Sequence, residues 1–179
     1  MEKLEIKEIV DQFFLVKLKK THLLSIRKDV RALITLSNQM DSRCIYLIKN
    51  ICKKAGKNSV KNTFFAIAEQ IFCSLPENLE IYNASGQIDY INWGRVVALL
   101  CFSVEMEDYC KKKGICGNFQ LADWCAIALT KRAEWIKNHR NDLMDNINAH
   151  EEYENISFFP IVAVLTMLGV GLLYYYAKV

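Results

Sequence analysis

One helical stretch, residues 93–102, carries apolar residues on every side. A helix of this kind cannot lie on a protein surface, because some of its apolar side chains would face water whichever way it turned. Other helices, each with one apolar face, must therefore surround it. At 179 residues with 52% hydrophobic content, the chain is long enough to build such a bundle as a single domain.

Four further stretches have apolar residues at the three- and four-residue steps of an amphipathic helix. They cover residues 6–18, 26–53, 60–72 and 121–136. The stretch 26–53 is long enough for one or two helices, and its apolar seam from Ile26 to Ile51 needs a partner surface. Because the chain contains only two prolines and seven glycines, long regular elements are favoured. We therefore predict an all-α fold around a central hydrophobic helix.

Local signals mark both ends of the central helix. Asn92 is a favoured N-cap residue, and Ile91 before it can pack against Val96 as a hydrophobic staple. At the other end, Gly114 suits the left-handed position that follows a helix, and the lysines at 111–113 suit a helix C-terminus. We expect the helix to begin after Asn92 and to end before Gly114.

Two residues in the first turn of this helix do not favour helix formation. Glycine at position 94 costs about 1 kcal/mol relative to alanine, and the charge of Arg95 faces the positive end of the helix dipole. A glycine lets another backbone approach closely, and an arginine offers a planar fork to a carboxylate. The pair therefore indicates a docking point for an acidic partner. The spacing by itself somewhat favours a plainer interpretation, with only a helix cap, a core tryptophan and a surface arginine.

The C-terminal segment, residues 156–177, contains no charged side chain. At 1.5 Å per residue it is long enough to cross a bilayer core of about 30 Å, and tyrosines near its end are typical of a membrane interface. We therefore predict one helical domain over residues 1–150, a short linker over 151–155 and a transmembrane tail anchor over 156–177. The single lysine after the anchor leaves the mitochondrial outer membrane and the endoplasmic reticulum both open.

Composition argues against several classes of function. The net charge of +3 comes from lysines and acids mixed along the chain, so we expect neither nucleic-acid binding nor a basic membrane patch. The seven cysteines lack the paired spacing of zinc or redox sites, and the charged N-terminus lacks a secretory signal, which favours reduced core cysteines in the cytosol. The histidines are scattered, and hydrolase, metalloprotease and phosphate-loop motifs are absent from the sequence. We expect no enzymatic activity, no metal and no cofactor.

The segment Asn92-Trp93-Gly94-Arg95-Val96-Val97-Ala98 resembles the first homology motif of the Bcl-2 family of apoptosis regulators. Residues 10–18 are similar to the fourth motif, with one residue more between Val10-Asp11 and Lys17-Leu18. The second motif is recognisable only at Trp135-Ile136, because its Gly-Gly-Trp is replaced around residues 140–142. The third motif is not clear, since Met40 occupies the glycine position between Leu36 and Asp41.

This resemblance implies a Bcl-2-like helical bundle with a C-terminal transmembrane helix. It also implies a hydrophobic groove that binds an amphipathic death-motif helix of a pro-apoptotic protein. By motif position, Arg95 would pair with the ligand's aspartate, Gly94 would admit its small residue and Asn92 would add a polar contact. The remaining groove residues would be Ile67, Gln70, Ile71, Val97 and Ala98, together with Cys44, Leu47 and Ile48 from the 26–53 stretch.

The resemblance implies an inhibitor of host apoptosis that sequesters Bak, Bax or Bim-like activators at the mitochondrial outer membrane. The unclear third motif favours a survival factor that binds death-motif helices over a killer that donates one. The abundance of Asn, Lys and Ile and the compact length are similar to those of poxviral members of the family, and an avian poxvirus is the source they favour.

Two alternatives stay open, a pore-forming pro-apoptotic member and a tail-anchored coiled-coil tethering protein that uses the Ile26–Ile51 seam. A tail-anchored enzyme ranks behind them, because no nucleophile or metal set is visible.

Overall fold

The computed structural model describes residues 3–18, 26–40, 42–54, 60–73, 91–115 and 120–149. These residues form eight α-helices and contain no β-strand, which confirms the prediction of an all-α fold. The helices are α1 (Lys3–Lys17), α2 (Lys28–Asn38), α3 (Ser42–Lys54), α4 (Val60–Cys73), α5 (Trp93–Lys113), α6 (Gln120–Thr130), α7 (Ala133–Asn138) and α8 (Arg140–Ala149). They share one hydrophobic core, which extends from Ile6 in α1 to Leu143 in α8.

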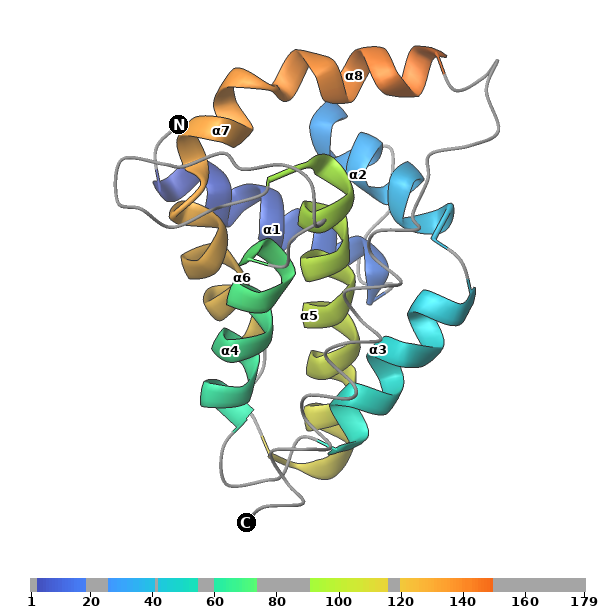
Figure 1. Ribbon diagram of the computed structural model, residues 1–179, viewed down its shortest axis with the longest axis vertical. Helices are drawn as coiled ribbons and strands as arrows, with labels where there is room; N and C mark the ends of the chain where they lie inside the picture. Colours follow the sequence, from blue (N-terminus) through green and yellow to red (C-terminus); the bar gives the residue numbers. More distant parts are fainter. Residues whose placement is uncertain are drawn as a thin grey trace.

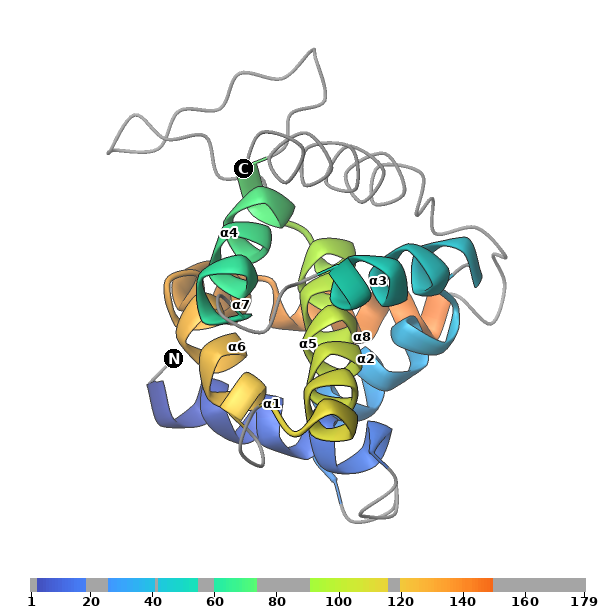
Figure 2. The same cartoon turned by 90° about the horizontal axis from the view of Figure 1, so that it is seen from below.

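Helix α5 occupies the centre of the bundle (Figure 1). It has 21 residues, and every residue from Arg95 to Val104 is buried. Helices α1, α2, α3, α4 and α6 all pack against it. Seen from below, α3 and α4 lie on either side of α5 (Figure 2). The predicted central hydrophobic helix is therefore confirmed, and the other helices are arranged so that they cover it.

Both predicted ends of α5 are confirmed. At its start the side-chain oxygen of Asn92 accepts a hydrogen bond from the backbone N–H of Arg95 at 2.9 Å, which is the N-cap arrangement. At its end Gly114 takes the left-handed conformation with φ of 63°. The N–H groups of Gly114 and Ile115 then donate to the carbonyls of Lys111 and Cys110, as in a Schellman motif.

Gly114→Ala should destabilise the fold through its backbone conformation alone. A Cβ added at this position would meet no atom within 4 Å, so strain in the left-handed region is the dominant cost, about 1 kcal/mol. Urea unfolding followed by circular dichroism should show this loss, with a smaller loss for Gly114→Asn, because asparagine tolerates the left-handed region. Equal stability of wild type and Gly114→Ala would contradict the assignment.

Two stretches that read as continuous helical patterns are each divided in the structure. The 26–53 stretch forms α2 and α3, and the chain turns between them, where the N–H groups of Gln39 and Met40 donate to carbonyls three residues back. Its seam residues Val30 and Ile51 are both buried in the bundle core, so neither is on the surface for a coiled-coil partner.

The 121–136 stretch also does not form one helix. It ends as α6 at Thr130 and resumes as α7 at Ala133. At this break the N–H of Arg132 donates to the carbonyl of Leu129, while its side chain donates to the carbonyl of Ala128 at 3.0 Å. These bonds satisfy carbonyl groups in the last turn of α6 that have no partner within the helix.

A cluster of ion pairs joins α1, α2 and α8. Arg27, just before α2, contacts Glu5 at 2.8 Å, Asp29 at 2.9 Å and Glu8 at 3.0 Å. Arg140 at the start of α8 contacts the same Asp29 at 2.7 Å and Glu5 at 3.0 Å. Asp29 is only 4% exposed, so its carboxylate depends on the two arginines in place of water. The cluster holds α8 against the N-terminal half of the bundle.

Glu5 should make this stability depend on pH. The hydrogen bond from Arg27 holds the pKa of Glu5 below its usual value in the folded protein, with a further contribution from Arg140. A lowered folded-state pKa means that the stabilisation is present above the unfolded pKa, about 4.3, and is lost as the pH falls through the folded value. The difference in unfolding free energy between wild type and Glu5→Gln should therefore shrink between about pH 5 and pH 3. A difference for Glu5→Gln that stays constant over this pH range would refute the proposed role.

The predicted linker, 151–155, and the predicted tail anchor, 156–177, lie outside the described residues. Within the described ranges, no helix is both long and apolar enough to cross a membrane. The predicted helical domain, 1–150, covers every helix that the structure describes, and the last of them ends at Ala149.

Candidate functional site

The start of α5 is held in place by α7 and by the residue that follows it. The indole Nε1 of Trp93 donates to the carbonyl of His139 at 3.1 Å. The rings of Trp93 and Trp135 lie 5.3 Å apart between centroids, and Trp135 stacks on the imidazole of His139 at 4.4 Å. Aromatic contacts of this kind favour one fixed arrangement. The segment similar to the first homology motif therefore lies directly against the Trp135-Ile136 segment.

Arg95 extends from this fixed turn to the end of α4. Its Nη1 donates to the main-chain carbonyl of Ile71 at 2.9 Å, and the residue is only 4% exposed. Ile71 lies in the last turn of α4, where carbonyls lack intrahelical partners and carry partial negative charge. A cation that is unfavourable at the start of its own helix thus stabilises the end of another. The plainer interpretation of Arg95 as a surface residue is wrong.

The predicted groove residues come from the start of α5 and from the two helices, α3 and α4, that pack on either side of it. Each of the apolar residues Ile48, Ile67, Ile71, Val97 and Ala98 is at most 2% exposed. Leu47 and Gly94 are half-buried, whereas Gln70 and Asn92 are exposed. Cys44 lies in α3, but its side chain lies outside the described part of the structure. These apolar side chains must therefore become exposed before a ligand can contact them.

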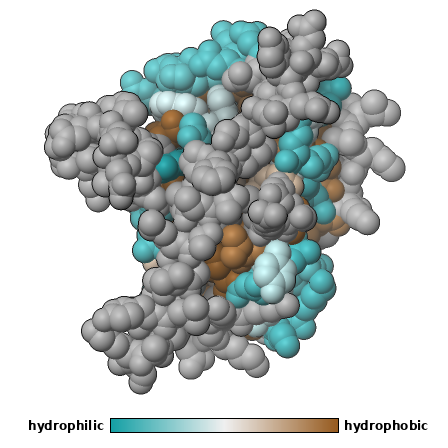
Figure 3. Space-filling view, turned by 45° about the vertical axis from the view of Figure 1, so that its right-hand side comes forward, coloured by the Kyte–Doolittle hydropathy of each residue, from teal (hydrophilic) through white to brown (hydrophobic). Residues whose placement is uncertain are grey.

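Helices α3 and α4 both pack along α5, and their described residues make few contacts with each other. Figures 1 and 2 show them on opposite sides of α5. In the space-filling view, a small apolar patch is visible in the middle of the face shown, next to hydrophilic side chains (Figure 3). The buried part of α5 on which α3 and α4 pack carries the predicted groove residues and is the candidate site for an apolar partner segment.

Helix α4 is attached at the same end by charged groups that sequence reasoning missed. Glu69 forms ion pairs with Lys131 and, at 3.2 Å, with Arg132. Burial acts to raise the pKa of Glu69, but hydrogen bonds from the two cations outweigh it, and the pKa lies below its usual value. The guanidinium of Arg132 also lies 4.0 Å from the ring centroid of Phe72, so it contacts α4 on both sides of Ile71. In the sequence, Arg132 lies in register with the apolar face of residues 121–136, and this position is the pattern that indicates a buried arginine.

Helix α3 is attached differently. Its described ion pair to α5 joins Lys49 and Glu105 at 3.9 Å, and both side chains are partly exposed. Pairs of this kind contribute about 0–1 kcal/mol. The helix is held mainly by buried apolar residues, Ile48 and Ile51. Both helices beside the candidate site thus pack through buried apolar residues, such as Ile48 of α3 and Phe64 of α4, and α4 has in addition charged contacts at its end.

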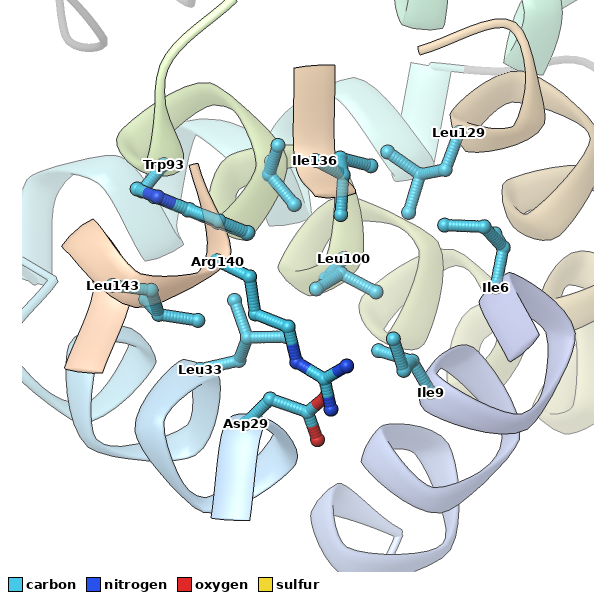
Figure 4. Close-up of a pocket in the computed structure, with 11 residues that line it drawn as sticks. Ile6, Ile9, Asp29, Leu33, Trp93, Leu100, Leu129, Ile136, Arg140 and Leu143 are labelled. Atoms are coloured by element: carbon cyan, nitrogen blue, oxygen red, sulfur yellow. The ribbon is translucent and has the colours of Figure 1, made fainter. Parts of the chain in front are cut away.

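A small cavity lies between α1, α2, the N-terminal part of α5 and the last three helices (Figure 4). Apolar side chains such as Ile6, Leu100 and Ile136 line it, and the Arg140 guanidinium faces the Asp29 carboxylate at its edge. Its volume of about 20 Å³ leaves room for roughly one water molecule. A cavity of this size is a packing feature and cannot hold a peptide helix.

Three cysteines with described side chains lie in the core. Cys101, Cys110 and Cys125 are buried and are not joined in disulfides, as expected for reduced core residues. Burial raises the pKa of the Cys125 thiol to about 12, so it stays protonated at physiological pH. Among the described residues, no three His, Cys, Asp or Glu side chains are grouped as metal ligands would be.

Comparison of the chain with known protein families, with curated proteins and with solved structures finds no significant match.

Asn92 offers a test of what its side chain does. Because its side chain caps α5, Asn92→Ala should lower the free energy of unfolding by about 1 kcal/mol. Asn92→Asp should retain full stability, since aspartate caps equally well and its charge suits a helix N-terminus. Chemical denaturation of both variants measures this, and equal losses for alanine and aspartate would argue against the cap.

Proposed function

We propose that the chain is a Bcl-2-like inhibitor of host apoptosis that sequesters the death-motif helices of pro-apoptotic proteins. The observation that carries this proposal is the position of the Asn92–Ala98 segment. This segment forms the start of α5, next to the end of α4, where Arg95 donates a hydrogen bond to the carbonyl of Ile71. The ligand helix would lie along α5 between α3 and α4.

The expected ligand contacts divide into an apolar and a charged part. Ile67, Ile71, Val97 and Ala98 would receive the apolar side chains of the ligand, and each large side chain that is buried contributes roughly 1.5–3 kcal/mol. The pair between Arg95 and a ligand aspartate would add about 1.5–3 kcal/mol. The apolar side chains would therefore supply most of the affinity, whereas Arg95 would set the register and the specificity.

The proposed site of action is the mitochondrial outer membrane, with the endoplasmic reticulum as the other membrane open to the chain. Residues 156–177 would insert as a tail anchor, which leaves the helical domain in the cytosol. At that membrane the domain would hold Bak, Bax or Bim-like activators. The motifs that carry the proposal are similar to those of poxviral family members.

A peptide panel tests the proposal. The chain truncated after residue 150, which keeps every described helix, should bind death-motif peptides with submicromolar affinity. Arg95→Ala should weaken the binding about tenfold to a hundredfold, because one charge-assisted hydrogen bond is lost. Isothermal titration calorimetry measures both. Arg31→Ala, which removes an exposed arginine on α2, is the matched control and should bind like wild type.

Two results would contradict the proposal. The absence of binding to any peptide of a broad panel would refute the recognition of a death-motif helix. Unchanged affinity in Arg95→Ala, with circular dichroism showing an intact fold, would refute the role of Arg95. Expression in cells separates an inhibitor from a pore-forming relative, because an inhibitor protects cells from a death stimulus and a pore former kills them.

A further inference from the structure

Arg95 already has a partner within the chain, at the place where the proposed ligand would offer another. Its Nη1 lies 2.9 Å from the carbonyl oxygen of Ile71, and the side chain is buried. The same Ile71 contributes an apolar side chain, 2% exposed, to the residues expected to contact the ligand. One residue of α4 therefore takes part in both the polar and the apolar half of the candidate site.

We propose that ligand binding proceeds by an exchange of partners at Arg95. Without ligand, the guanidinium holds the last turn of α4 through the Ile71 carbonyl. When a helix with a carboxylate binds, the guanidinium passes to that carboxylate, and the last turn of α4 is released so that Ile71 can contact the ligand. This inference rests on the proposed function and concerns the regulation of the same site.

The energetics favour the exchange in this direction. A carboxylate carries a full negative charge and offers two oxygens that a guanidinium can bind together, whereas a carbonyl offers one neutral oxygen, so an aspartate competes successfully with a carbonyl. The backbone at Arg95 need not move, because the N–H of Arg95 is held by the side chain of Asn92. Only the long side chain changes its partner.

The neighbouring contacts keep the release local. Glu69, two residues before Ile71, is paired with Lys131 and Arg132. Phe72, one residue after it, lies under the guanidinium of Arg132. Because these contacts do not involve Arg95, α4 stays attached to the turn between α6 and α7 while its Ile71 carbonyl is freed. A ligand without a carboxylate at the right position would leave Arg95 hydrogen-bonded to the carbonyl of Ile71.

Hydrogen–deuterium exchange on the full chain in detergent micelles tests the exchange of partners. Two synthetic amphipathic peptides are compared at saturating concentration, one with an aspartate at the motif position and one with asparagine there. Amides of residues 69–73 should exchange about tenfold faster with the aspartate peptide than with the asparagine peptide.

Variants without any peptide give a second comparison. Free Arg95→Ala should show the same faster exchange of these amides, and free Arg31→Ala should match wild type. Should Arg95→Ala fail to fold, Arg95→Lys, which keeps the charge but loses the planar fork, replaces it.

The outcomes separate this inference from the proposed function. Binding of both peptides with equal exchange at residues 69–73 would overturn the exchange of partners and leave the proposed function standing. Binding of neither peptide would overturn both, because no carboxylate would then reach Arg95. Faster exchange with the aspartate peptide in wild type, and no difference between the peptides in Arg95→Ala, is the expected result.

Discussion

The burial of α5 is the constraint on which the rest of the structure depends. This helix has no face that can be exposed to water along residues 95–104, and five other helices pack against it. Their own apolar faces are buried by the same contacts, so the hydrophobic effect acts on all of them at once. The cap at Asn92 and the left-handed Gly114 then limit how far this buried segment extends.

Charged groups buried in the bundle connect the ends of helices. Arg95 donates to a carbonyl in the last turn of α4, and Arg132 donates to one in the last turn of α6. Glu107 on α5 accepts a hydrogen bond at 3.0 Å from the N–H of Leu121, in the first turn of α6. Cations thus contact helix C-termini and an anion contacts a helix N-terminus, as the helix dipole favours. Each of these charges satisfies backbone groups that apolar packing would leave without partners.

The same arrangement gives the candidate site its character. Helix α4 packs through buried apolar residues such as Phe64 and Ile67, and its last turns also receive polar contacts from Arg95 and Arg132, whereas the described contacts of α3 are mainly apolar. The aromatic contact between Trp93 and Trp135 holds the start of α5 while the side chain of Arg95 is bound to α4. A helix that binds on α5 would therefore meet apolar side chains from both neighbours. The proposed role of Arg95 depends on the polar contacts at the end of α4.

The sequence by itself determined the all-α class, the central position of residues 93–102 and both ends of that helix, because these follow from patterns within one segment. It also indicated which apolar residues are buried, since helical periodicity reports which face is covered. Only the tertiary structure decided where the side chain of Arg95 goes, because its partner, Ile71, is 24 residues away and offers a backbone carbonyl that no side-chain pattern reveals. The same holds for Asp29 and Arg140, and for the breaks after Asn38 and Thr130, where turns override a continuous helical pattern. Long-range polar contacts form between groups that are brought together only when the core is packed, and for this reason local sequence could not specify them.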